Sequence, residues 1–350
     1  MKNLKEILSR LKQNTMFRLS LGSKELFHTN YWALLLSKYP EVMTKVFCKD
    51  SDCHAAEIRR EAEHTDLSFL LNNKLTIIEN KFKSYPYLEQ LERYLNNKNV
   101  DKITLISFFE PHFLLEENDL NSKIECISYE ELFNRLNRIN SDLIVREDYP
   151  FFCSYLEMLE LLQKIKSRLS LKNRTYKEVY EEILEAKEIS QEFNFFSTIQ
   201  KLFLNELRCD LLRDDEIKKH APFTNVDYAS RAKEVFLDIM LNYENNSLGI
   251  RNIGITIANN CNIRHYIGAQ KLGKERLEIE EAFNSELSWF FQNCTGHKSN
   301  NIRFNGYDMK EENCVWLYKT HKSDNILDCN FDGIKEHILE KFKSIKEMLV

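Results

Sequence analysis

Residues 75–94 read LTIIENKFKSYPYLEQLERY, and this stretch decides how the first part of the chain is interpreted. Leu75 to Ile78 form an apolar run typical of a buried strand, and the charged residues Glu79 and Lys81 follow it directly. Burying a carboxylate or an ammonium without a partner costs several kcal/mol, so a strand end of this kind needs a reason. Glu79 and Lys81 are two residues apart on the strand and therefore project from one face.

The composition is that of a folded protein with enough apolar material for one large domain or two ordinary ones. The 350 residues are 43% hydrophobic and 29% charged, with only 8 glycines and 5 prolines. We find no internal repeat and no long low-complexity segment. The expected class is therefore α/β with many helices.

The first residues, MKNLKEILSRLKQNTMF, have apolar positions at helical spacing and no continuous apolar region. They predict a helix rather than a signal peptide, and no stretch approaches the roughly 20 apolar residues of a membrane span. We therefore expect a cytoplasmic protein with reduced cysteines and no membrane partner. Cys48, Cys53 and His54 lack the spacing of a zinc site, and we interpret them as free side chains.

Before residue 148 the expected order of elements is helix, three strands, helix, strand. The turn residues Asn72-Asn73-Lys74 make the third strand the returning arm of a hairpin. The patterns predict a helix over 24–37, strands over 56–64, 66–72 and 75–82, a helix over 86–97, a strand over 103–109, a short strand over 124–127 and a helix over 129–139.

The rest of the chain has a different character. Apolar residues at helical spacing predict a helical region over 148–245, and 246–350 is expected to be an α+β region of unknown role. The expected domains are thus 1–147, 148–245 and 246–350. In the last region we expect a hairpin that turns at Asn259-Asn260, a helix around 275–291, a strand over 315–318 and a terminal helix that uses Ile334, Ile338, Phe342 and Ile345.

The hairpin brings two carboxylates into one neighbourhood. Asp66 opens one strand and Glu79 lies on the next, although the register is not fixed by the sequence. Two nearby carboxylates repel, and one is pushed toward protonation unless a cation holds both. Mg²⁺ prefers carboxylate and carbonyl oxygens together with water, and a neighbouring ammonium such as Lys81 orients or helps deprotonate an attacking water. The chemistry that fits is metal-assisted phosphodiester hydrolysis.

Asp66 followed by Glu79-Asn80-Lys81 resembles the PD-(D/E)XK nuclease superfamily, whose restriction-endonuclease-like core has the same αβββαβ order. Glu25 resembles the helix-borne glutamate of that superfamily. Gln90 and Tyr94, one helical turn apart, resemble the QxxxY motif of its RecB-like and lambda-exonuclease-like branches. The similarity covers about residues 20–110, and Thr65 stands where the superfamily commonly has a proline.

The resemblance implies a deoxyribonuclease that uses Mg²⁺, with Mn²⁺ as a substitute, in a restriction-like or phage-defence role. The implied metal ligands are Asp66, Glu79, the backbone carbonyl of Asn80 and Glu25, which binds directly or through water. Lys81 would act on the nucleophilic water. Gln90 and Tyr94 would position the substrate backbone, with His28 and Arg93 as further phosphate contacts.

Less specific interpretations stay open beside this one. Glu79 and Lys81 alone could be a surface ion pair, Glu25 could simply complement a helix dipole, and Arg93 could be a solvated helix residue. The formal net charge of −5 gives no overall basic field, so a nucleic-acid surface has to be a local patch. The alternative function is a non-catalytic nucleic-acid-binding or assembly module built on a nuclease fold. DNA or RNA, end-dependent or internal cleavage, and a homo-oligomer or monomer are all left open.

Overall fold

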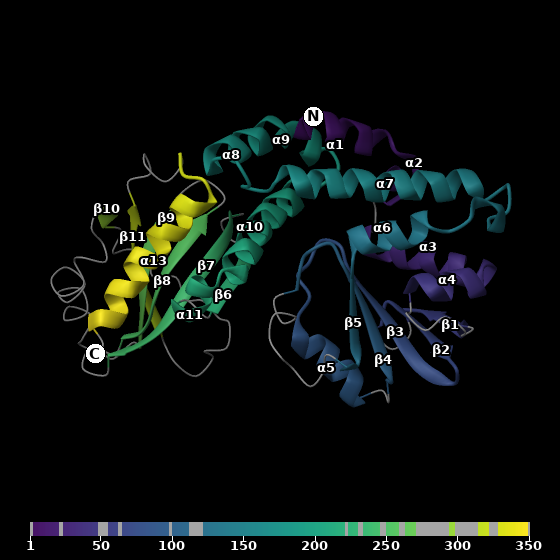
Figure 1. Cartoon of the computed structure of the whole chain (residues 1–350), viewed down its shortest axis with the longest axis horizontal. Coiled ribbons are helices and arrows are strands. Elements are labelled where there is room, and N and C mark those ends of the chain that lie inside the picture. Colours follow the sequence, from purple (N-terminus) through teal and green to yellow (C-terminus); the bar gives the residue numbers. More distant parts are fainter. Residues whose placement is uncertain are drawn as a thin grey trace. The chain divides into compact units, whose positions relative to one another are not determined.

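Two sheets organise the chain, and each belongs to its own unit of a computed structural model (Figure 1). The first unit comprises Met1–Arg168 and Glu185–Thr198, and the second comprises Leu169–Leu184 and Ile199–Val350. The structure describes residues 3–20, 24–47, 55–61, 65–97, 100–111, 122–220, 223–229, 234–245, 250–258, 263–270, 294–297, 314–321 and 328–348.

The sheet of the first unit is mixed, which confirms the expected α/β class. Its strands lie in the order in which the chain presents them, β1 to β5. Strands β1, β2 and β3 pair antiparallel, whereas β3, β4 and β5 pair parallel. The strands are β1 (Ala55–Arg60), β2 (Leu67–Leu71), β3 (Lys74–Lys81), β4 (Lys102–Ser107) and β5 (Ile124–Ser128).

The hairpin turn forms where the sequence predicts it. Leu71 pairs with Lys74, and the two residues between them, Asn72 and Asn73, have φ of 50° and 62°. Two consecutive residues with positive φ form the tight turn that matches the twist of paired strands, and asparagine tolerates this backbone conformation better than most residues. The turn thereby fixes the register of β2 against β3.

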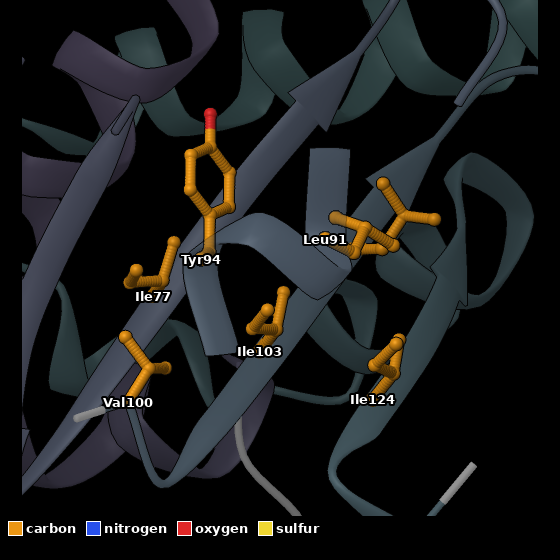
Figure 2. Close-up of a cluster of buried hydrophobic side chains, with 7 residues drawn as sticks. Ile77, Leu91, Tyr94, Val100, Ile103 and Ile124 are labelled. Carbon is orange, nitrogen blue, oxygen red and sulfur yellow. The ribbon is translucent and has the colours of Figure 1, made fainter. Parts of the chain in front are cut away.

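Helix α5 (Leu88–Asn97) is the crossover that makes the β3–β4 pairing parallel. It begins two residues after Pro86, slightly later than expected. Figure 2 shows its Leu91 and Tyr94 among the aliphatic side chains of the sheet, with the hydroxyl of Tyr94 directed away from them. This cluster of buried side chains comprises Ile77, Leu91, Tyr94, Val100, Ile103, Leu105 and Ile124.

Other helices of the first unit pack around the opposite face of the sheet and around α7. Helix α7 contacts α1, α2 and α6, and α3 contacts β1 and β3. The buried side chains Tyr155, Leu159 and Leu162 recur at helical spacing along α7. The first unit therefore extends past residue 147, where we placed a boundary. These helices are α1 (Leu4–Gln13), α2 (Thr15–Ser20), α3 (Lys24–Lys38), α4 (Pro40–Phe47), α6 (Tyr129–Asn137), α7 (Tyr149–Arg168) and α9 (Lys187–Gln191).

The second unit contains an antiparallel sheet in the order β10-β11-β9-β8-β7-β6. Its strands are β6 (Phe223–Ala229), β7 (Glu234–Asn245), β8 (Ile250–Ala258), β9 (Ile263–Gln270), β10 (Cys294–His297) and β11 (Cys314–His321). Its helices are α8 (Tyr176–Glu185), α10 (Phe196–Arg213), α11 (Asp215–His220) and α13 (Phe331–Met348); the last residue of α8 and the first three of α10 belong to the first unit.

Several expectations for this part of the chain can be compared with the structure. The region 148–245, which we expected to be helical, is helical only as far as His220, and β6 and β7 follow. Runs such as Val235 to Ile239 are buried and pair with neighbouring strands. The pairing of β8 with β9 and the terminal helix agree with expectation. The helix expected around 275–291 and the turn at Asn259-Asn260 lie outside the described residues.

None of the helices in the described part of the chain is both long enough and apolar enough to cross a membrane.

Candidate active site

The carboxylates that the sequence singles out meet where β2 begins and β3 ends. Asp66 immediately precedes β2, and Leu67 pairs with Ile78, so Asp66 lies next to the end of β3. Ile77 packs against α5, and Glu79 projects from the same face because side chains alternate along a strand. The turn and the α5 crossover together create this arrangement.

Glu79 lies at the centre of the site and is 2% exposed. Its Oε1 accepts hydrogen bonds from Lys81 Nζ and Gln90 Nε2, both at 2.7 Å. Its Oε2 is buried and has no hydrogen-bond partner among the described residues. A buried carboxylate oxygen without a donor is costly and rare in native structures. The site therefore has the capacity for one more positive ligand at Glu79.

Asp66 is a carboxylate whose ionised form is disfavoured by its surroundings. Its Oδ2 accepts a hydrogen bond from the backbone N–H of Asn80 at 2.8 Å. Burial, and next the charge of Glu79, raise the pKa of Asp66 to about 7, with a smaller contribution from Glu25. The Asn80 hydrogen bond and Lys81 act in the opposite direction without cancelling this effect. Near neutral pH, part of the population therefore carries a proton on Asp66.

Lys81 is a charged group at neutral pH. Burial by itself lowers the pKa of its ammonium, but the adjacent Glu79 and the charges of Glu25 and Asp66 raise it above its ordinary value. The side chain is 13% exposed. Lys81 therefore donates hydrogen bonds and positive charge, and it holds its proton too tightly to accept another group's proton.

Helix α5 contributes Gln90 and Tyr94 on the face that meets Glu79. Gln90 Nε2 donates to Glu79 Oε1 and to Tyr94 Oη, each at 2.7 Å. Burial, and next the charge of Glu79, raise the pKa of Tyr94, which stays a neutral phenol. We expected both residues to position the substrate backbone. In the structure the amide nitrogen of Gln90 holds Glu79 in place, and the role of the two residues toward a substrate stays a prediction.

Glu25 has a different partner from the one the resemblance implies. Its Oε1 accepts the backbone N–H groups of Phe82 at 3.1 Å and Lys83 at 2.9 Å, and the hydroxyl of Ser84 at 3.1 Å. These bonds fasten the segment that follows β3 to the first turn of α3. These bonds occupy Oε1, which is therefore a weak candidate for direct metal coordination, and a metal contact through the rest of the carboxylate stays a prediction. Glu25 therefore fixes the backbone beside Lys81.

Asn80 points to the opposite face of the sheet from Glu79. Its Nδ2 donates to the backbone carbonyl of Glu25 at 3.0 Å, and its Oδ1 accepts from Tyr129 Oη at 2.9 Å. The fully buried Asn80 thus links β3 to α3 and α6. Nothing in the sequence indicated that Tyr129 would bind Asn80, because its pattern indicates only the first apolar position of a helix.

His28 does not reach the site. It is 1% exposed and has aromatic neighbours that include Trp32, Phe82 and Tyr129. Its Nδ1 contacts Tyr155 Oη at 2.8 Å, and burial lowers its pKa to about 3. His28 is therefore a neutral core residue, which is incompatible with the phosphate contact we expected of it.

The remaining sequence predictions concern Arg93 and the group of Cys48, Cys53 and His54. Arg93 is exposed on α5, as either interpretation of it requires. Cys48, Cys53 and His54 lie outside the described residues. No group of three or more histidine, cysteine, aspartate or glutamate side chains gathers around a common point in the described residues. Asp66 and Glu79 are the two carboxylates considered below as ligands of a metal ion at this site.

Two carboxylates are sufficient for one class of ion. Mg²⁺ retains several waters and is commonly held by one or two carboxylates together with substrate phosphate. The unpartnered Glu79 Oε2 and the raised pKa of Asp66 are both defects that a divalent cation between them would relieve. The residues present therefore fit Mg²⁺ or Mn²⁺, and they do not fit the closed ligand set of a structural zinc site.

Comparison of the chain with protein-family models, with curated proteins and with solved structures found no match.

Proposed function

We propose that this chain is a metal-dependent nuclease that hydrolyses phosphodiester bonds, with DNA as its substrate. The observation that carries the proposal is the buried Glu79, which has one oxygen bound by Lys81 and Gln90 and the other without a donor among the described residues, beside Asp66 with its raised pKa. Burying these charged groups together costs folding free energy, and a purely structural role does not account for that cost.

The arrangement of the first sheet supports the same proposal. An antiparallel hairpin followed by a helical crossover into parallel strands is the order of a restriction-endonuclease-like core. Asp66, Glu79 and Lys81 lie where β2 begins and β3 ends, as the corresponding residues do in the PD-(D/E)XK superfamily that they resemble. Fold alone does not fix activity, so the proposal depends on the site chemistry.

Asp66 and Glu79 would hold Mg²⁺ or Mn²⁺, while the hydrogen bonds to Oε1 of Glu25 argue against that oxygen as a third ligand. When bound, such an ion supplies a Lewis acid for a phosphoryl oxygen and lowers the pKa of a coordinated water. Every other contribution comes from the chain itself.

The charge and the contacts of each side chain determine its role at the site. Lys81, which is charged at neutral pH, donates to Glu79 and offers positive charge to an anionic phosphoryl group. Gln90 orients Glu79, and Tyr94 accepts from Gln90, so that the carboxylate keeps one rotamer. Glu25 fixes the backbone after β3. In this scheme Lys81 orients the attacking water and stabilises charge, whereas its raised pKa argues against a role as general base.

DNA is preferred over RNA because Gln90 and Tyr94 resemble the QxxxY helix of DNA-degrading branches of the superfamily. A restriction-like or phage-defence role is the biological setting that this resemblance suggests.

The test uses linear and circular DNA, single-stranded DNA and RNA, each incubated with the full chain and Mg²⁺, Mn²⁺ or EDTA. We expect metal-dependent cleavage of DNA that Asp66→Asn and Glu79→Gln abolish. Asp142→Asn, at an exposed position, is the matched control and should cleave normally. Failure of the wild-type chain to cleave any nucleic acid, or full activity of Asp66→Asn, would refute the proposal.

One observation favours a non-catalytic binding module as the second candidate. The Oε1 of the helix-borne Glu25 is bound to backbone donors, so this oxygen is not available to a metal ion. Calorimetric titration with Mn²⁺ separates the candidates, because a nuclease should bind the ion through Asp66 and Glu79. A module that only binds nucleic acid should retain DNA binding with no measurable affinity for Mn²⁺.

A further inference from the structure

Strand β1 lies at the edge of the first sheet, next to β2 (Figure 1). Its pairing with β2 contains a backbone irregularity close to the candidate active site. Ala56 pairs with Leu70 and Arg59 pairs with Ser68, so β1 uses one more residue than β2 over this interval. Within the bulge, Glu57 has φ of 50°. A residue with a side chain adopts this conformation at a cost, and such outliers next to a site are reasons to look for function.

The bulge decides which way the two arginines of β1 face. In an uninterrupted pairing, Ile58 would lie opposite Ser68 and Arg59 opposite Leu67. The extra residue shifts the register by one and thereby turns every later side chain to the other face. Arg59 consequently lies opposite Ser68, and Arg60 lies opposite Leu67.

The face on which Arg59 lies is that of the candidate site. Ser68 pairs with Ile77, whose side chain packs against α5, and Glu79 follows Ile77 on the same face. Because directly paired residues of antiparallel strands project to one side, Arg59 shares this face. Arg60 projects to the other side, as its hydrogen bond to Asn30 of α3 at 2.8 Å shows.

Arg59 is within side-chain reach of the carboxylates. Strand spacing and rise place the Cα atoms of Arg59 and Asp66 on the order of 8 Å apart. The Arg59 side chain is 66% exposed, and its guanidinium pairs with Glu57 Oε2 at 2.6 Å. An exposed ion pair of this kind is weak, so a competing anion can displace Glu57.

We propose that Arg59 binds a backbone phosphate of the nucleic acid next to the one that is cleaved, and that Glu57 competes with this phosphate for the guanidinium. The inference rests on the proposed nuclease function. Arginine suits the role because its planar guanidinium binds phosphate through two parallel hydrogen bonds. The bulge then serves to aim a cation at a substrate strand that lies along β1 and β2.

The experiment measures binding of a fluorescent DNA duplex in EDTA, where no cleavage occurs, over a range of salt concentrations. Arg59→Ala should weaken binding on the order of tenfold and reduce the slope of log affinity against log salt by about 1. Arg60→Ala, one residue further on the opposite face, is the matched control and should bind like wild type. Arg59→Lys should restore part of the affinity.

The competition is tested separately. Glu57→Gln should tighten DNA binding several-fold, and this gain should disappear in the double variant with Arg59→Ala. With Mg²⁺, Arg59→Ala should raise KM more than it lowers kcat. If the wild type cleaves DNA and Arg59→Ala binds like Arg60→Ala, the inference is wrong while the nuclease proposal stands. If the wild type neither binds nor cleaves nucleic acid, both are wrong.

Discussion

Replacing Asp66 by asparagine should stabilise the metal-free protein. Burial and the charge of Glu79 raise the pKa of Asp66 from 3.8 to about 7, so the folded chain disfavours the ionised form. Below pH 3.8 the carboxyl is protonated in both folded and unfolded chains and has no effect. Between pH 3.8 and 7 only the unfolded chain ionises, so folding stability falls as pH rises, and above pH 7 the cost is constant.

The magnitude follows from the size of the pKa change. Because each pKa unit corresponds to about 1.4 kcal/mol, the ionised Asp66 costs up to about 4 kcal/mol above pH 7 and between 1 and 2 kcal/mol, roughly, at pH 5. Asp66→Asn removes this cost, and its amide oxygen can still accept the hydrogen bond from the N–H of Asn80. The variant should therefore be more stable than wild type, by a margin that grows with pH.

The assay is urea unfolding of both proteins in EDTA at pH 4, 5, 6, 7 and 8, repeated with Mg²⁺ at pH 8. Mg²⁺ should stabilise the wild type and leave Asp66→Asn almost unchanged. The exposed Asp142→Asn controls for the loss of one charge and should show no pH-dependent gain. A stability difference that is independent of pH, or a less stable Asp66→Asn at pH 8, would refute the electrostatic reasoning.

Four further predictions concern residues around the site. Leu91→Ala should cost about 2–5 kcal/mol in urea unfolding because the side chain is buried in the cluster of Figure 2. Tyr129→Phe should cost about 1–3 kcal/mol, since the buried Oδ1 of Asn80 loses its donor; an unchanged urea midpoint would contradict this. Burial lowers the pKa of His28 from 6.5 to about 3, so the contribution of His28 to stability should fall as pH drops below 6.5, by about 2 kcal/mol at pH 5; His28→Gln removes this contribution, so its stability relative to wild type should rise by about this amount between pH 7 and pH 5 in the same titration. Gln90→Ala should reduce the rate of DNA cleavage by about 10- to 100-fold with little change in melting temperature, because Glu79 loses an orienting donor; a normal rate would show that this bond is dispensable.

Local patterns predicted much of the first unit. The apolar run before Glu79, the Asn72-Asn73 turn and the helix with Gln90 and Tyr94 one turn apart each lie within about 25 residues, so their geometry follows from strand alternation and helical periodicity. The same reasoning failed between residues 223 and 245. The apolar residues there follow a helical region along the chain, and their sequence pattern alone does not distinguish a further helix from a strand. Only pairing with neighbouring strands makes them β6 and β7.

By itself, the sequence determined that Glu79 and Lys81 share a face at the end of a buried strand and that Asp66 opens the strand before it. Tertiary structure decided what each polar group touches. Glu25 precedes Phe82 by 57 residues, and His28 precedes Tyr155 by 127. Separations of this size are closed only by sheet register and helix packing, which depend on the whole core at once. The same packing places Glu25 against backbone N–H groups, buries His28, and leaves one oxygen of Glu79 without a donor in the part of the chain that the structure describes.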